Sequence, residues 1–148
     1  MTGRKILILD IDGTLVNSDK KITPETLKYL MEIQRQGHLV ALASGRPFPG
    51  MKQYADALEL ERYGGYALSF NGGKVINCAT GEVIYQNCIP RRFAKVLYEF
   101  AKEKKIGMVT YQGDKVITGT DTDNYMEFEA RLNHMQLCEV DDFLGYVD

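Results

Sequence analysis

The sequence predicts an α/β fold in which a parallel-sheet core is followed by a smaller α+β module. In the first half of the chain, short apolar runs alternate with segments of helical periodicity, which is the pattern of strands joined by helical crossovers. In the second half, turn residues separate short strand-like runs and indicate hairpins. The chain has 148 residues, 45% of them hydrophobic, so it has enough apolar side chains to bury a core.

The first predicted strand covers residues 6–9, an Ile-Leu-Ile-Leu run. A run without polar alternation is typical of a strand buried on both faces of a parallel sheet, so we expect a central strand. A helix should start after Thr23, which offers an N-cap before Pro24. Gly37 suits the position just after a helix, so this helix should end near Gln36.

Two more strands are predicted in the first half of the chain, over residues 39–43 and 66–70. Between them, Met51, Ala55 and Leu58 recur at helical spacing. Strands that alternate with helices in this way are joined by right-handed parallel crossovers.

The pattern changes after the third strand. Residues 75–77 and 83–85 flank a turn at residues 79–81 and predict a hairpin. We place the domain boundary near this hairpin, with a core over residues 1–84 and an α+β module over residues 85–148.

The α+β module should begin with an amphipathic helix over residues 90–105. Residues 108–111 and 115–118 predict a second hairpin. Asp121 or Thr122 is then expected to cap a further helix.

Composition argues against several classes of partner. A formal net charge of -2 gives no basic field, so we expect neither a nucleic acid nor a membrane partner. Apolar runs such as residues 6–9 are far shorter than the roughly 18 residues of a membrane-spanning helix, and no signal peptide is expected. Cys78, Cys88 and Cys138 lack C-x-x-C spacing and should be reduced thiols, which indicates the cytoplasm.

Two aspartates follow the first strand directly. Asp10 and Asp12 are two residues apart, so strand geometry would put both carboxylates on one side, at the end of the strand where open α/β sheets bind ligands. The alternative is a hairpin turn at Asp12-Gly13, but the strand before it lacks the polar alternation of a hairpin. We therefore interpret this segment as a site.

Three segments together resemble the haloacid dehalogenase superfamily. Residues 10–15 (DIDGTL) resemble its first motif, residues 43–47 (ASGRP) its second, and residues 69–73 (SFNGG) the Asn-Gly element of the Cof-type subfamily, which includes many sugar phosphatases. The resemblance covers the whole chain but matches about the first half of a family member. It implies a three-layer, Rossmann-like parallel-sheet core with an inserted α+β cap, both partial.

The resemblance assigns roles in the first motif. Asp10 would be the nucleophile that forms an aspartyl-phosphate, and Asp12 the general acid and then the general base. An oxygen of Asp10 and the backbone carbonyl of Asp12 would hold Mg²⁺. Thr14 would position the loop through its backbone or hydroxyl.

The resemblance also assigns roles in the second and third segments. The Ser44 hydroxyl would bind the transferring phosphoryl group and the Gly45 amide would add a donor at the start of a helix, although a plain polar loop is the alternative. Arg46 would reach a substrate anion, or be an exposed or structurally paired arginine. Asn71 would lie on the substrate side, or only form a turn.

Two family motifs have no counterpart in the sequence. The lysine that balances charge and the Gly-Asp-rich acidic motif that completes the magnesium site are missing, and the Gly113-Asp114 pair lies in the expected cap. We expect a magnesium-dependent phosphatase of small phosphorylated metabolites, most of all sugar phosphates, whose 148-residue part alone is inactive or weakly active. The alternatives are a non-catalytic binding or assembly module and a phosphotransferase such as a mutase.

The missing part also has a consequence for the sheet. The resemblance implies that two further strands normally lie beside the strand at residues 6–9. Without them that strand is an edge with unpaired backbone groups, and we expect homo-oligomers to form through it.

Overall fold

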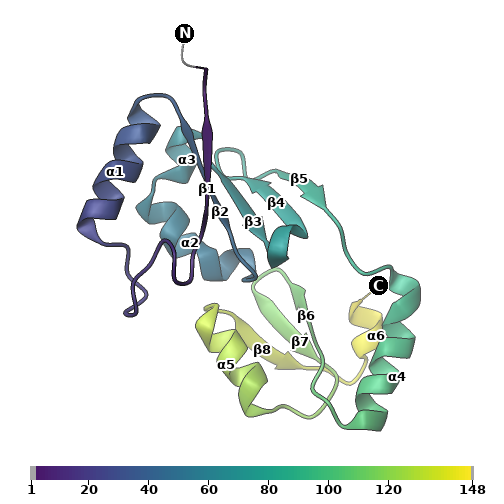
Figure 1. Ribbon diagram of the computed structural model, residues 1–148. Helices are drawn as coiled ribbons and strands as arrows, with labels where there is room; N and C mark the ends of the chain where they lie inside the picture. The colour runs from purple at the N-terminus through teal and green to yellow at the C-terminus, as the bar shows by residue number, and fades with distance from the viewer. Residues whose placement is uncertain (1–2, 148) are drawn as a thin grey trace. The chain divides into compact units, whose positions relative to one another are not determined.

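The computed structural model describes residues 3–147, which fold as two compact units (Figure 1). The first unit is Met1–Asn87 and the second is Cys88–Asp148. Each unit has its own sheet and its own helices.

The first unit is built on a five-stranded sheet with the order β1-β2-β3-β4-β5. The first three strands run parallel, as the sequence predicts, and the last two are antiparallel and form the predicted hairpin. The strands are β1 (Ile6–Asp10), β2 (Leu39–Ala43), β3 (Tyr66–Ser69), β4 (Lys74–Asn77) and β5 (Val83–Gln86).

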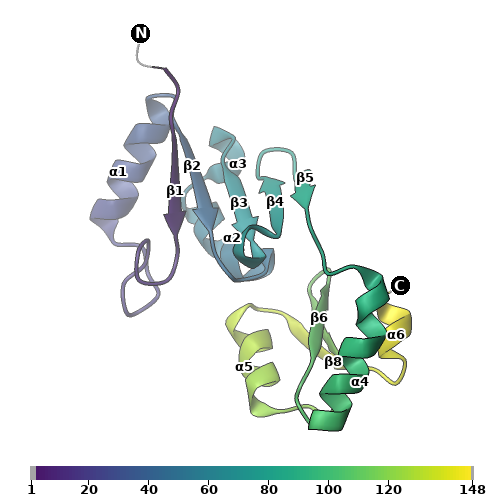
Figure 2. The same cartoon turned by 45° about the vertical axis from the view of Figure 1, so that its right-hand side comes forward.

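Three helices pack on one side of this sheet (Figures 1 and 2). They are α1 (Pro24–Arg35), α2 (Phe48–Ala57) and α3 (Leu60–Tyr63), and a 3-10 turn η1 (Phe70–Gly72) follows β3. Right-handed crossovers that progress in one direction across a parallel sheet put their helices on the same face. The core lies between sheet and helices and includes the fully buried Val40, Leu42, Met51, Leu58 and Leu60.

The first helix follows its sequence signals closely. The Thr23 hydroxyl accepts a hydrogen bond from the Thr26 amide, and Pro24 opens the helix. Gly37 has φ 88, a left-handed conformation that glycine adopts without steric cost and that ends the helix. The short helix α3 was not predicted, because four residues are too few to show a helical period.

The prediction of a central, fully buried first strand is wrong. β1 lies at the edge of the sheet, paired only with β2, and Ile6, Leu7 and Ile8 are 49%, 40% and 52% exposed. The partly buried Leu9 packs on the core, so by strand alternation Ile6 and Ile8 point to the face opposite the helices. This arrangement agrees with the edge strand expected from the resemblance.

The second unit combines a three-stranded sheet, of order β6-β7-β8, with helices. β6 and β7 form the predicted hairpin, whereas β8 runs parallel to β7 and was not predicted, nor was the last helix. Its elements are a 3-10 turn η2 (Arg91–Phe93), α4 (Ala94–Lys104), β6 (Val109–Gln112), β7 (Lys115–Thr118), α5 (Asn124–Leu132), β8 (Gln136–Glu139) and α6 (Phe143–Tyr146).

The cap of α5 differs from the expectation. Asp123, not Asp121 or Thr122, is the N-cap, and its carboxylate accepts hydrogen bonds from the Tyr125 and Met126 amides at 2.9 and 2.8 Å. Three consecutive capping residues cannot be ranked from sequence, because the start of the helix depends on how α5 packs on its sheet.

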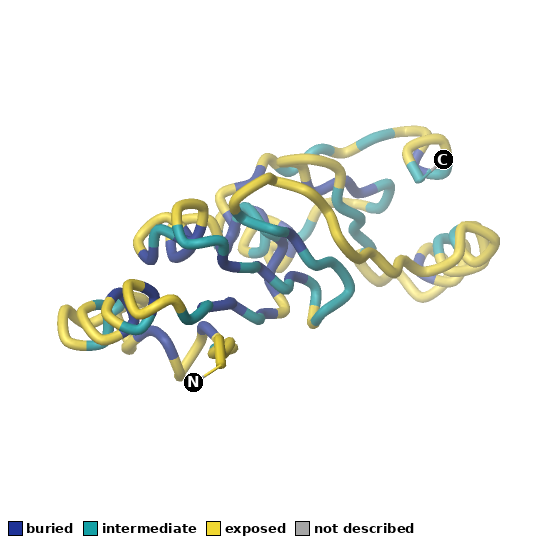
Figure 3. Tube along the Cα trace, turned by 90° about the horizontal axis from the view of Figure 1, so that it is seen from above, coloured by how far each residue is buried: buried dark blue, intermediate teal, exposed yellow. Residues whose placement is uncertain are grey.

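Large parts of the second half of the chain are exposed. Residues 79–93 are exposed throughout (Figure 3), and the apolar face of α4 remains open, with Val96 and Phe100 56% and 53% exposed. No helix within residues 3–147 is both long and apolar enough to cross a membrane.

Candidate active site

The loop after β1 separates its apolar residues from its polar ones. Ile11, Leu15 and Val16 are buried, while Asp10 and Asp12 are exposed. Backbone hydrogen bonds from the Leu15 amide to the Asp10 and Ile11 carbonyls, both 3.1 Å, close the turn. The buried residues thus anchor a loop that presents both carboxylates to solvent.

Glycine permits this turn at one position. Gly13 has φ 79, a left-handed conformation that would be strained for a residue with a side chain. Thr14 follows it, is exposed, and its amide donates to the Ile11 carbonyl at 3.5 Å. The motif residues therefore lie in one tight turn at the carboxyl end of β1.

Asp12 is held by two cations. Arg46 donates from Nε to Oδ2 at 3.0 Å and from Nη2 to Oδ1 at 2.8 Å, and Lys20 Nζ lies 2.7 Å from Oδ1. Hydrogen bonds from Arg46 are the main cause that lowers the pKa of Asp12, partial burial opposes them, and Lys20 adds to the lowering. The Asp12 side chain is therefore a carboxylate fixed in orientation.

The Asp10 carboxylate differs from its neighbour. Among the residues that the structure describes, it has no hydrogen-bond or ion-pair partner, and Asp10 is exposed at the end of β1. A carboxylate without a partner keeps its oxygen lone pairs available for a substrate or a metal ion. The two aspartates of the motif thus differ in their contacts, since cations bind the Asp12 carboxylate and not the Asp10 carboxylate.

Arg46 is buried although it is charged. Its side chain is 8% exposed, and Nη1 donates to the Gly50 carbonyl at 3.4 Å. Its guanidinium lies 5.9 Å from the centre of the Tyr54 ring. Of the roles considered for Arg46, the paired arginine matches this geometry, since Nε, Nη1 and Nη2 each donate one hydrogen bond to a protein oxygen.

The loops after β2 and β3 are tied together beside the first loop. Ser44 is 7% exposed, and its hydroxyl accepts the Arg46 amide at 3.3 Å. The Asn71 amide donates to the Ser44 carbonyl at 2.9 Å. Asn71 has φ 55, a left-handed conformation that asparagine tolerates better than most residues.

Gly45 precedes the helix that it was expected to start. α2 begins at Phe48, so the Gly45 amide lies in the connecting loop. A Cβ at Gly45 would lie 3.3 Å from the Asn71 amide oxygen, which shows how closely Asn71 approaches this loop. A side chain at position 45 would therefore require a small shift of the Asn71 side chain.

The strand registers bring these loops together at the carboxyl ends of the parallel strands. Asp10 is the partner of Ala43 in β1 and β2, and Ala43 is the partner of Leu68 in β2 and β3. The carboxyl ends of three parallel strands are therefore level. Predicted site residues follow each strand directly: residues 11–14 follow β1, residues 44–46 follow β2 and residues 70–72 follow β3.

The oxygen ligands present fit magnesium in part. Both Asp12 carboxylate oxygens are bonded to cations, which leaves its backbone carbonyl and the free Asp10 carboxylate as the hard oxygen donors. No group of three or more His, Cys, Asp or Glu residues that could hold a metal ion occurs within residues 3–147. Mg²⁺ is often held by one or two protein groups together with water and substrate phosphate.

Lys20 is the residue at this site that the sequence did not indicate. It lies in the loop between β1 and α1, and a lysine in a polar loop carries no pattern of its own. Its contact with Asp12 arises from the fold of residues 17–21.

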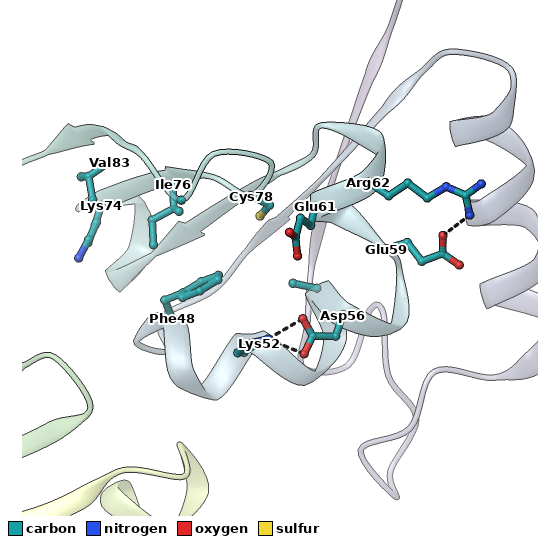
Figure 4. A pocket seen from close by; sticks show the side chains of 12 residues that line it. Phe48, Lys52, Asp56, Glu59, Glu61, Arg62, Lys74, Ile76, Cys78 and Val83 are labelled. Carbon is teal, nitrogen blue, oxygen red and sulfur yellow. Dashed lines mark hydrogen bonds and ion pairs between the residues drawn. The ribbon is translucent and has the colours of Figure 1, made fainter.

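A separate groove of about 670 Å³ lies between α2, α3 and the β4-β5 hairpin (Figure 4). Four of its charged side chains form two ion pairs, since Lys52 lies 2.7 Å from Asp56 and Arg62 lies 2.8 Å from Glu59. Burial raises the pKa of the Cys78 thiol in its wall to about 11, so Cys78 stays protonated. None of the predicted site residues lines this groove.

Comparison with known proteins identifies the family. The model of haloacid dehalogenase-like hydrolases matches residues 7–147. The chain belongs to this family. Family membership agrees with the two aspartates found at the end of β1.

Individual relatives support the same family. A haloacid dehalogenase-like hydrolase from Bacteroides thetaiotaomicron has 40% sequence identity and a TM-score of 0.88 over 97% of this chain and 54% of that one. "Putative phosphatase YxeH" of Bacillus subtilis (strain 168) is 28% identical over 90% of this chain and 50% of its own length. The HAD subclass IIB sugar phosphatase BT4131 shares the fold, with 18% identity and a TM-score of 0.71.

The chain spans about half the length of the relatives that it matches. Its α/β architecture is that of these hydrolases.

Proposed function

We propose that the chain is part of a magnesium-dependent phosphatase that hydrolyses small phosphorylated metabolites, with sugar phosphates as the substrate class. The observation that carries the proposal is the pair of aspartates at the end of β1, one without a partner and one held by Arg46. Relatives that are named phosphatases and a sugar phosphatase of the same fold support it. We also propose a cytoplasmic location.

Asp10 acts as the nucleophile in this proposal. One of its oxygens attacks phosphorus, the bond from phosphorus to the leaving oxygen breaks, and an aspartyl-phosphate forms on Asp10. Water then attacks the phosphorus, which releases phosphate and restores the carboxylate. The absence of a protein partner on the described Asp10 carboxylate supports this role.

Asp12 acts as the general acid and then as the general base in this proposal. Its carboxylate takes up a proton when the negative charge of the bound phosphoryl group offsets the positive charge of Arg46 and Lys20. The protonated Asp12 then gives this proton to the leaving alkoxide in the first step, and the resulting carboxylate takes one from the attacking water in the second. Arg46 positions Asp12, because two hydrogen bonds from one planar group fix both the place and the tilt of the carboxylate.

The remaining predicted residues would bind the phosphoryl group or position the loops around it. The Ser44 hydroxyl and the Gly45 amide would donate to its oxygens, Thr14 keeps the first loop in place, and Asn71 lies beside Gly45 on the substrate side. Mg²⁺, held by the Asp10 carboxylate and the Asp12 carbonyl, would neutralise phosphoryl charge when bound. The second unit would serve as the cap.

The test requires the complete protein as well as the 148-residue chain. In the complete protein, Asp10→Asn should abolish magnesium-dependent hydrolysis of an aryl phosphate, and Asp12→Asn should reduce it severely, because a covalent nucleophile and a proton donor are lost. The control is Asp19→Asn, an exposed carboxylate in the same connection between β1 and α1. Turnover by Asp10→Asn near the unaltered rate would remove Asp10 from the mechanism.

The 148-residue chain alone should show little or no turnover. Charge-balancing groups around a transferring phosphoryl group are often the largest catalytic contribution, and the family's lysine and acidic motif have no counterpart in this sequence. Saturable turnover by the chain that disappears in Asp10→Asn would contradict this expectation.

A further inference from the structure

Asp12 is contacted by two cations although one of them already satisfies both of its oxygens. Arg46 bonds to Oδ2 and Oδ1 at 3.0 and 2.8 Å, and the Lys20 ammonium adds a contact of 2.7 Å to Oδ1. A carboxylate in a two-point pair with arginine needs no second cation. Lys20 is therefore a second cation on a carboxylate that Arg46 already pairs.

The two cations differ in how firmly they are held. Arg46 is 8% exposed and also bonds to the Gly50 carbonyl, whereas the Lys20 side chain is 55% exposed. An ion pair formed by an exposed lysine contributes only about 0 to 1 kcal/mol. Lys20 can therefore exchange Asp12 for another anion, while Arg46 keeps Asp12 in place.

Hydrogen bonds hold the backbone around Lys20 in place, although the Lys20 side chain is exposed. The Asn17 side-chain oxygen accepts the Asp19 and Lys21 amides, both at 3.0 Å, and the Lys20 amide donates to the Asn17 carbonyl at 3.0 Å. The hydroxyl of the buried Tyr54 donates to the Lys20 carbonyl at 3.3 Å. The loop thus brings the ammonium to the site from a fixed position.

We propose that Lys20 binds the anionic group of the substrate, exchanging its contact with Asp12 for the oxygens of a phosphoryl group. The inference rests on the proposed phosphatase function and names a binding residue of that site. A phosphoryl dianion is a stronger partner for an ammonium group than a carboxylate that arginine already neutralises. The compact ammonium, with three donors on a flexible stem, suits a group that must arrive and leave.

The proposal can be tested by calorimetric titration of the 148-residue chain with inorganic phosphate in a magnesium buffer. Lys20→Met should weaken phosphate binding about tenfold, because it removes one charge-assisted hydrogen bond. Lys20→Arg keeps the charge and should stay within about threefold of the unaltered chain. The matched control is Lys21→Met, which removes an exposed lysine from the same loop and should leave phosphate binding unchanged.

The outcomes separate this inference from the proposed function. If Ser44→Ala weakens phosphate binding and Lys20→Met does not, the site binds phosphate and the role of Lys20 is refuted. An equal effect of Lys20→Met and Lys21→Met would also refute it, because the effect would then come from net charge. If the unaltered chain shows no saturable binding, its loops do not form a phosphate site and the role of Lys20 is refuted, whereas the proposed function is tested separately by Asp10→Asn in the complete protein. Amide spectra of the variants should show an unchanged loop fold.

Discussion

Replacing Arg46 with methionine should lower the free energy of unfolding by about 2 kcal/mol. The substitution keeps a long apolar stem but removes the two hydrogen bonds to Asp12 and the bond to the Gly50 carbonyl. A hydrogen bond to a charged group is worth about 1.5 to 3 kcal/mol, and the 41% exposure of the Asp12 side chain reduces the value of this pair toward that of a surface ion pair. For a unit of this size, about 2 kcal/mol corresponds to a fall in melting temperature of roughly 10 °C.

The assay is urea unfolding of the 148-residue chain followed by circular dichroism. Arg35→Met is the control, since Arg35 contacts Glu32 at 3.8 Å with both side chains more than half exposed, and it should cost less than about 0.5 kcal/mol. A double-mutant cycle with Asp12→Asn isolates the pair. A cost for Arg46→Met no larger than that of the control, or no coupling in the cycle, would refute the reasoning.

Three other expectations follow from the structure. The exposed β1 edge should make the chain self-associate, and Ile6→Lys with Ile8→Lys should restore monomers; light scattering that finds a monodisperse 16.7 kDa monomer of the unaltered chain would contradict this. Asp123→Ala should cost about 1 kcal/mol of stability in urea unfolding and Asp121→Ala much less, and equal costs would disprove the cap. Because the pKa of Asp12 is lowered on folding, its contribution to stability is present above the unfolded value of 3.8 and is lost as pH falls through the folded value. In Asp12→Asn the free energy of unfolding should therefore fall less steeply as the pH is lowered. Equal slopes for the variant and the unaltered chain would argue against a lowered pKa of Asp12.

The elements of the first unit could be predicted because their signals are local. The cap at Thr23, the glycine after α1 and the apolar runs of β2 and β3 each depend on a few neighbouring residues, and each led to the correct element. The candidate site motif was equally visible, since Asp10 and Asp12 follow a strand in a pattern that few segments share. Roles for these residues remain proposals.

Tertiary structure decided everything that depends on distant partners. An apolar run specifies a strand but not its neighbours, so the run at residues 6–9 led to a wrong prediction of a central strand, and only the family resemblance led to the expectation of an edge. Arg46 and Asp12 are 34 residues apart, and their pairing requires β1 and β2 to lie in register. Lys20 reaches the same carboxylate only because residues 17–21 fold back on themselves.

The sequence by itself therefore determined the family, the presence of three parallel strands and the two aspartates, all of which are encoded by neighbouring residues. Only the tertiary structure decided the charge environment of those aspartates. The physical reason is that electrostatic contacts act over a few ångströms in space, whatever the separation along the chain. The identities of Arg46 and Lys20 can be read in the sequence, but their positions at Asp12 follow from packing.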